Sequence, residues 1–255
     1  MPADTADNVT DDAILNGRLR LLQPRRGHRF GHDAILLAAA IAAQPGEHLV
    51  EFGAGVGAAS LALLARISGI DVTLVEIDPG LAALATENLG RNGFTSRARA
   101  VTADVGALAD GNVIAPASAD HVFMNPPFNT DSHQPAPDSG RRNAHHGAAD
   151  VLPRWLDAAR MLLKPSGYIT VIWRADGLDA LLETLRPAFG SISVRPVYPG
   201  PGRTAIRVIV SARLGGKAAL RLAPPLVLND AAQKPSPAAE AILRAGEGWP
   251  DDLDG

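Results

Sequence analysis

The sequence predicts an α/β fold in which helices cover both faces of a mostly parallel sheet. Short apolar runs alternate with helical stretches of roughly 10 to 15 residues, as in βαβ units. A glycine-rich turn, Gly53-Ala54-Gly55-Val56-Gly57, follows the first buried run. A later run, 119–124, ends abruptly in Asn125-Pro126-Pro127-Phe128, and proline cannot extend a sheet ladder. Both motifs are therefore expected at the carboxyl edge of the sheet, where ligands of such folds bind.

Composition bounds the class of protein. The chain has 255 residues, of which 46% are hydrophobic and 20% charged, the balance of a globular domain. It has no cysteine, which excludes disulfides, thiolate nucleophiles and cysteine-type zinc sites. No apolar run reaches the roughly 18 residues of a membrane span, and the acidic start lacks the features of a signal peptide. We therefore expect a cytoplasmic protein without a membrane partner.

The first part of the chain is expected to be a leader to the core. Residues 1–17 are predicted to be a flexible tail, and 18–22 alternates like a short strand that Pro24 ends. Asp33 is expected to cap a helix over 34–43. The leader is assigned to 18–45.

The core, 46–212, is predicted to alternate strands with helices. Asp78-Pro79 supplies an N-cap and a proline at the first helical position. Strands are expected at 48–52, 71–76, 97–102, 119–124, 168–173, 192–197 and 204–212, with helices at 58–68, 79–92, 152–163 and 178–185.

The rest of the chain is expected to lie outside this alternation. Residues 129–150 have no periodicity and suggest a lid or binding loop. We predict one domain, 18–228, followed by an extension, 229–255, that contains a short helix at 237–245.

Three acidic residues indicate which ligand the glycine turn binds. Glu51, Glu76 and Asp104 lie at or near the ends of three successive strands. A carboxylate after the second strand can accept ribose hydroxyls, one after the third can accept an adenine amino proton, and Glu51 can face an ammonium. Ribose, adenine and an amino acid together describe S-adenosylmethionine. The alternatives are surface or capping roles for the acids, and a nicotinamide dinucleotide site, which Gly53-x-Gly55-x-x-Ala58 also fits.

The ordered set of motifs resembles class I methyltransferases that act on exocyclic or amide nitrogens. Glu51-x-Gly53-x-Gly55-x-Gly57, Glu76, Asp104 and Asn125-Pro126-Pro127-Phe128 carry the resemblance, which spans about 27–212. It implies a Rossmann-like, seven-stranded, mostly parallel sheet with an antiparallel last strand.

A narrower resemblance is to the bacterial family that methylates N6 of an adenine in the anticodon loop of a valine tRNA. Leu21-Leu22-Gln23-Pro24 and Arg29-Phe30-Gly31-His32-Asp33-Ala34 resemble its leader, and 203–207, 224–226 and 240–244 fit its alphaproteobacterial branch. The better-studied members have Tyr where this chain has Phe128.

The resemblance implies site residues. Catalysis is assigned to Asn125, Pro126, Pro127 and Phe128. Contacts with S-adenosylmethionine are assigned to Arg29, Phe30, Asp33, Glu51, Gly53, Ala54, Gly55, Gly57, Glu76, Ile77, Asp104, Val105 and Asn125. RNA contacts are assigned to Arg141, Arg142 and Arg203, with a solvated loop as the alternative for the first two. No metal is expected.

The chemistry of the Asn-Pro-Pro-Phe motif suits an aromatic amine. The Asn125 side-chain oxygen and the Pro126 carbonyl can accept its two hydrogens and so pull the nitrogen toward sp³ geometry. Phe128 offers a face on which a flipped base stacks, worth roughly 1–3 kcal/mol.

We therefore predict an enzyme that methylates a tRNA adenine at N6 and is a monomer or homodimer. Alternative substrates are guanine N2 of rRNA and a glutamine amide of a release factor. A nicotinamide-dependent oxidoreductase and a non-catalytic RNA-binding module are the alternatives from other classes.

Overall fold

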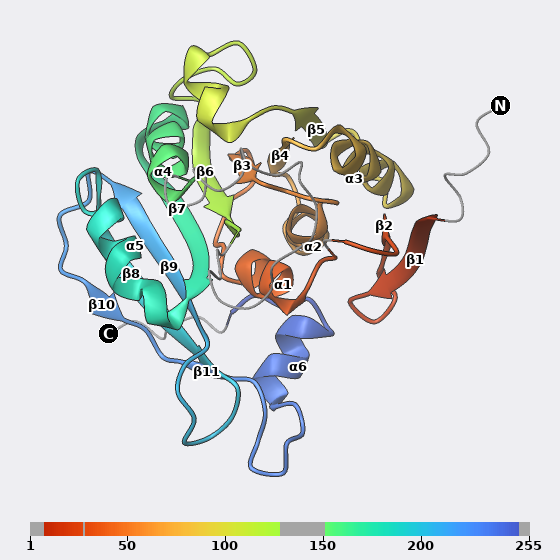
Figure 1. Cartoon of the computed structure of the whole chain (residues 1–255), viewed down its shortest axis with the longest axis vertical. Helices are drawn as coiled ribbons and strands as arrows, with labels where there is room; N and C mark the ends of the chain where they lie inside the picture. Colours follow the sequence, from red (N-terminus) through yellow and green to blue (C-terminus); the bar gives the residue numbers. More distant parts are fainter. Residues whose placement is uncertain (1–7, 28, 128–150, 250–255) are drawn as a thin grey trace, which may run out of the picture.

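A central sheet of seven long strands organises the molecule (Figure 1). The computed structural model describes residues 8–27, 29–127 and 151–249. Five of the strands run parallel: β3 (His48–Phe52), β4 (Asp71–Glu76), β5 (Ala98–Thr102), β6 (Ala119–Met124) and β7 (Leu163–Arg174). The last two are β8 (Phe189–Tyr198) and β9 (Arg207–Leu214).

The last long strand, β9, runs in the opposite direction to the other six. The order along the sheet is β8-β9-β7-β6-β3-β4-β5, and β9 is antiparallel to both of its neighbours. Two short strands, β10 (Arg221–Leu222) and β11 (Leu226–Val227), pair with the free edge of β8. The predicted seven-stranded sheet with an antiparallel last strand is thus confirmed, with two short additions.

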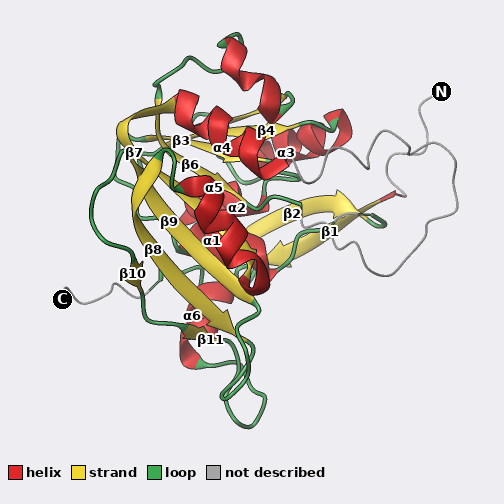
Figure 2. Ribbon diagram, turned by 60° about the vertical axis from the view of Figure 1, so that its left-hand side comes forward, coloured by secondary structure: helices red, strands yellow, loops and turns green. Residues whose placement is uncertain are grey.

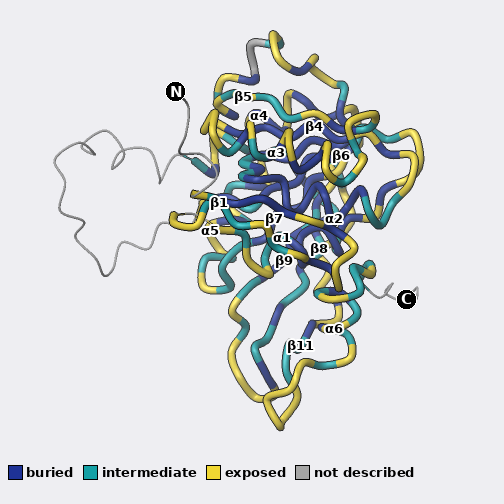
Figure 3. Tube along the Cα trace, turned by 90° about the vertical axis from the view of Figure 1, so that its right-hand side faces the viewer, coloured by how far each residue is buried: buried dark blue, intermediate teal, exposed yellow. Residues whose placement is uncertain are grey.

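Helices form a layer on each face of the sheet. One face carries α1 (His32–Ala39), α2 (Ala58–Arg66) and α3 (Pro79–Arg91), whereas the other carries the 3-10 helix η2 (Val105–Asp110), α4 (Val151–Leu162) and α5 (Leu178–Leu185). On β6, Phe123 packs into the first layer, and its neighbours Val122 and Met124 pack into the second. The buried residues lie in the central strands and helices, and exposed residues cover the outer turns (Figure 3).

A β-hairpin precedes the core, contrary to the predicted flexible tail over 1–17. Strand β1 (Val9–Ile14) pairs with β2 (Leu19–Pro24) over six residue pairs, and the hairpin projects from the sheet (Figure 2). Leu19 and Leu21 of β2 are buried in the first core layer. The prediction failed because β1 carries two aspartates, whose arginine partners lie outside this strand.

Two boundaries near the site also differ from the predictions. Helix α1 begins at His32 after the N-cap Gly31, so Asp33 lies in its first turn and does not cap it. The helix ends at Ala39, four residues earlier than expected. Strand β7 begins at Leu163, earlier than the strand expected at 168–173, and this start is irregular: Ser166 has a φ of 65° and the pairing with β6 shifts register.

The last described segment packs against the first helix. Helix α6 (Pro237–Leu243) contacts α1, and the N–H of Trp249 donates to the carbonyl of Ala39 at 2.9 Å. Within the described ranges, every helix is too short or too polar to cross a membrane.

Candidate functional site

A cavity of about 430 Å³ opens at the carboxyl edge of β3 and β6. Its walls come from the glycine turn after β3, the motif after β6, the loop before α1 and the start of β9. Ten residues that the sequence assigned to the site line it: Arg29, Phe30, Asp33, Glu51, Gly53, Ala54, Gly55, Asn125, Pro126 and Pro127. Residues more than 90 positions apart are therefore brought together at the predicted sheet edge.

The glycine turn adopts a backbone that only glycine takes readily. Gly53, Gly55 and Gly57 have φ values of 65°, 57° and 86°, in the left-handed region. Trp155 of α4 lies directly beneath Gly53, where an added Cβ would be 2.6 Å from its ring. Gly57 begins α2 as its N-cap and does not line the cavity. Gly53 thus leaves room for the Trp155 ring, whereas nothing lies within 4 Å of the Cβ position of Gly55, which lines the cavity.

Glu51 is a buried carboxyl group in the cavity wall. Its side chain accepts hydrogen bonds from the N–H and the hydroxyl of Ser60. Burial raises the pKa of Glu51 to about 8, and the nearby Glu76 adds to the effect. A raised pKa means that burial disfavours the charged carboxylate. A cationic ligand beside Glu51 would stabilise the carboxylate and lower this pKa again.

The carboxylate of Glu76 accepts hydrogen bonds from backbone N–H groups in the glycine turn and after β4. Its two carboxylate oxygens accept from the N–H of Gly55 at 2.7 Å and from the N–H of Asp78 at 2.9 Å. It does not line the cavity, and the adjacent Ile77 is 65% exposed on the surface. The predicted contact of Glu76 with a ribose and the predicted contact of Ile77 with the cofactor remain predictions. Asp78 caps α3 as predicted, accepting from the N–H groups of Gly80 and Leu81.

Asp104 and Val105 lie apart from the cavity lining. Asp104 caps η2 by accepting from the N–H of Gly106 at 2.8 Å, and it forms an ion pair with Arg154 at 3.2 Å. Val105 is buried in the second core layer. An adenine amino group would therefore compete with Arg154 for Asp104, because Arg154 already pairs with one carboxylate oxygen of Asp104.

Asn125 carries the most informative atom of the site. It follows the last residue of β6, and its Oδ1 is buried without a hydrogen-bond partner in the part of the chain that the structure describes. Pro126 is buried and Pro127 is exposed. Phe128 lies outside the described residues, so its predicted stacking role remains untested.

Arg207 is a site residue that the prediction missed. It begins β9, lines the cavity, and donates from Nε to Oδ2 of Asp33 at 2.8 Å. The signal in the sequence was an arginine directly before the apolar run 208–210. Only the fold brings it to the cavity, because Asp33 is 174 residues away in sequence.

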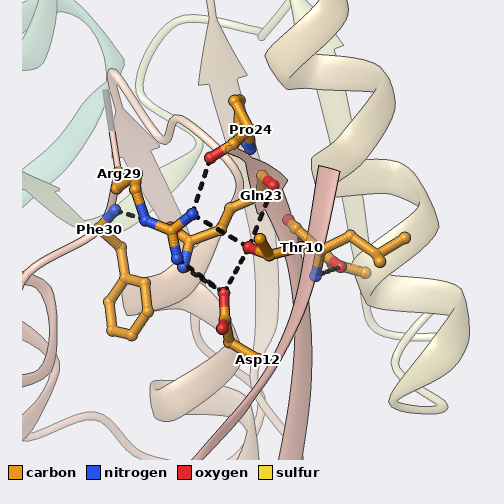
Figure 4. A network of polar contacts seen from close by, with 8 residues as sticks. Thr10, Asp12, Gln23, Pro24, Arg29 and Phe30 are labelled. Carbon is orange, nitrogen blue, oxygen red and sulfur yellow. Dashed lines mark hydrogen bonds and ion pairs between the residues drawn. The ribbon is translucent and has the colours of Figure 1, made fainter. Parts of the chain in front are cut away.

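The β1–β2 hairpin positions the outer wall of the cavity (Figure 4). Arg29 donates to Asp12, Thr10 and the carbonyl of Pro24, all on the hairpin. The N–H of Phe30 donates to Oε1 of the buried Gln23 at 3.2 Å. Two of the side chains that attach the site to the hairpin, Thr10 and Asp12, belong to the segment that was expected to be a flexible tail.

Of the three residues assigned to RNA, only Arg203 is described, and it does not line the cavity. Arg203 is exposed in the turn between β8 and β9. Arg141 and Arg142 lie outside the described residues. These three assignments stay predictions.

Comparison with known proteins gives a family match. The family described as Methyltransferase small domain matches residues 29–195. A curated relative from Trichodesmium erythraeum, named tRNA1(Val) (adenine(37)-N6)-methyltransferase, is 30% identical over 59% of this chain and 62% of its own. A protein of the same name from Dyadobacter fermentans is 28% identical over 56% of this chain and 58% of its own. The chain thus spans about three fifths of the length of these relatives.

Solved structures share the fold. A predicted O-methyltransferase from Agrobacterium tumefaciens superposes with a TM-score of 0.72 at 24% identity, over 87% of this chain and 100% of that chain. A tRNA (m1A58) methyltransferase from Aquifex aeolicus has a TM-score of 0.52 at 16% identity, over 77% of this chain and 73% of that chain.

Proposed function

Because the chain belongs to the methyltransferase small domain family, we propose that it methylates N6 of an adenine in the anticodon loop of a valine tRNA, using S-adenosylmethionine. The observation that carries this proposal is the buried Oδ1 of Asn125, which has no partner among the described residues and borders the cavity. Leaving such an acceptor unpaired is destabilising by about 1–3 kcal/mol. A ligand with an N–H donor would satisfy it.

The cavity fits S-adenosylmethionine in size and charge. Pockets for small ligands have volumes of roughly 300–1,000 Å³, and this one measures about 430 Å³. Nothing lies within 4 Å of the Cβ position of Gly55, so a ligand can approach its backbone closely, and the buried Glu51 suits the ammonium of the methionyl group. When bound, the sulfonium supplies the electrophilic methyl group.

Asn125 and Pro126 would orient the amine. The lone pair of an aromatic amine is delocalised into the ring, and acceptors on its hydrogens draw the lone pair back onto nitrogen. We assign one such bond to Asn125 Oδ1: Asn125 directly follows the end of β6 at Met124, and prolines at 126 and 127 stiffen the chain after it. A base in a structured RNA must be turned out of its stack to reach such a cavity.

The choice of adenine in a valine tRNA follows the two curated relatives, whose name specifies that nucleotide. Both match this chain over more than half of its length. We extend their substrate to this chain as part of the proposal.

The test is methylation of an unmodified valine tRNA with isotopically labelled S-adenosylmethionine, followed by mass analysis of the nucleosides. We expect labelled N6-methyladenosine from the wild-type protein, and a loss of more than about 100-fold in kcat with Asn125→Ala. Asn112→Ala is the matched control, because Asn112 is an exposed amide in the turn before β6.

Two outcomes would overturn parts of the proposal. Label found only in guanine of rRNA or in a release factor would replace the substrate while keeping the apparatus. Full activity of Asn125→Ala would overturn the role of the amide itself.

A further inference from the structure

Arg29 is held at one edge by two oxygens of the hairpin. Its Nη1 donates to Thr10 Oγ1 at 3.0 Å, and its Nη2 donates to Asp12 Oδ2 at 2.9 Å. These two oxygens are 2.7 Å apart, because the Thr10 hydroxyl donates to the same Asp12 oxygen. The two oxygens accept from the Nη1–Nη2 end of the guanidinium in the way that the two oxygens of one carboxylate would (Figure 4).

The opposite edge of the same guanidinium is open. An arginine has five N–H donors, and the second N–H of Nη1 donates to the carbonyl of Pro24 at 2.9 Å. The N–H of Nε and the second N–H of Nη2 are left, and no described residue accepts from either. These two N–H groups point the same way and match the two oxygens of a planar oxyanion.

This open edge belongs to a residue of the cavity wall, and Glu51 lies in the same wall. The zwitterionic end of an amino acid needs one partner for its ammonium and one for its carboxylate. Glu51 can pair with the ammonium, and Arg29 can pair with the carboxylate. The cavity would then hold both charged groups of the methionyl part.

We infer that the Nε–Nη2 edge of Arg29 binds the α-carboxylate of S-adenosylmethionine, and that Asp12 is the residue that positions it. This inference rests on the proposed function. Asp12 lies on the hairpin, outside the cavity, and would act on the carboxylate of the cofactor only through Arg29.

The surroundings of Asp12 fit a positioning role. Asp12 Oδ2 also accepts from Nε2 of Gln23 at 2.7 Å, and Gln23 is only 2% exposed. Hydrogen bonds from Gln23 and Thr10 hold the pKa of Asp12 below its ordinary value. The carboxylate is therefore ionised at neutral pH, and Arg29 is fixed before the ligand arrives, which reduces the entropy lost on binding.

The test compares two ligands that differ only in the carboxylate. Calorimetry would measure the Kd of S-adenosylhomocysteine and of its decarboxylated analogue. We expect the wild-type protein to prefer S-adenosylhomocysteine by about 10- to 100-fold, the range for a charged hydrogen-bonded pair. Arg29→Gln should bring this ratio close to one, and Asp12→Asn should reduce it by several fold.

Arg20→Gln is the matched control. Arg20 lies on the same hairpin and pairs with Asp11, but it does not line the cavity. It should keep the wild-type ratio. Melting curves of each variant without ligand would show that the hairpin still folds, and the ratio of two Kd values cancels a uniform loss of folded protein.

Three outcomes would count against the inference. Equal weakening of both ligands by Arg29→Gln would show that the edge does not hold the carboxylate. An unchanged ratio, with a higher KM for tRNA and a weaker salt dependence, would assign the edge to an RNA phosphate instead. Failure of the wild-type protein to bind either ligand would overturn the proposed function itself.

Discussion

Asn88 of α3 and Leu22 of β2 exchange two hydrogen bonds in the interior of the protein. The N–H of Leu22 donates to Asn88 Oδ1 at 2.7 Å, and Asn88 Nδ2 donates back to the carbonyl of Leu22 at 2.9 Å. The same Nδ2 reaches the carbonyl of Val56 in the glycine turn at 3.0 Å. One buried amide therefore joins the hairpin, the helix and the cavity wall.

Replacing Asn88 with alanine should destabilise the protein by about 3 kcal/mol, because three buried backbone groups lose their partner. Asn92→Ala is the control: Asn92 makes the same pair of bonds with Arg20, but in an exposed position. Water replaces the lost bonds there, so about 1 kcal/mol is expected. Urea denaturation of both variants measures the difference, and equal losses would contradict the joint role of Asn88.

Gly53→Ala should destabilise the protein more than Gly55→Ala does. Both variants place a side chain at a positive φ, which costs roughly 1–2 kcal/mol. At Gly53 the new Cβ would also lie 2.6 Å from the ring of Trp155, whereas at Gly55 nothing lies within 4 Å. We expect Gly53→Ala to lose about 1–3 kcal/mol more than Gly55→Ala does, as for overpacked cores.

Thermal or urea unfolding of the two glycine variants measures this difference. The double variant Gly53→Ala/Trp155→Leu removes the ring and should recover part of the extra loss. If the two alanine variants were equally stable, Trp155 would not constrain the turn.

Glu51 should make the protein less stable as the pH rises from about 4.5 to 8. Its pKa is raised from 4.5 to about 8 in the folded state, so the folded protein binds the proton more tightly than the unfolded chain. Stability then falls with pH across this window, by on the order of 5 kcal/mol. Glu51→Gln keeps a hydrogen-bond acceptor for Ser60 without the titration.

Urea denaturation at pH 6 and pH 8.5 would reveal the effect of Glu51. We expect Glu51→Gln to gain stability relative to the wild-type protein at the higher pH. Parallel stability curves for the two proteins would mean that Glu51 is charged throughout. The sites of other titrating groups are the same in both proteins, so their contributions cancel.

His121 should act in the opposite direction at lower pH. Burial lowers the pKa of His121 from 6.5 to about 4, and its Nε2 lies 2.8 Å from the Thr170 hydroxyl. The unfolded chain binds the proton more tightly, so stability is lost as the pH falls from 6.5 toward 4, by about 3 kcal/mol.

His121→Gln should remove this part of the acid sensitivity. The check is the difference in unfolding free energy between variant and wild-type protein at pH 5 and pH 7, with His48→Gln as the control. His48 is only partly buried and contacts Ser118 and Thr73. An equal change in both histidine variants would show that burial of His121 is not the cause.

The sequence by itself determined the sheet and the place of the site on it. Apolar periodicity located the seven long strands, and the glycine turn and Asn125 marked the ends of β3 and β6. Both features can be read from a few consecutive residues. A strand that is buried on both faces appears as a continuous apolar run, and a left-handed turn requires glycine whatever the rest of the chain does. That is why the carboxyl edge, the lining residues 53–55 and Asn125 could be placed in advance.

The tertiary structure alone decided which distant side chains meet. Asp33, expected to cap a helix, pairs instead with Arg207 across 174 residues, and Asp104 pairs with Arg154. The aspartates of β1, expected in a flexible tail, hold Arg29 and Arg91. A charge in a sequence gives no information about its partner, because pairing depends on which elements the packed core brings within hydrogen-bonding distance.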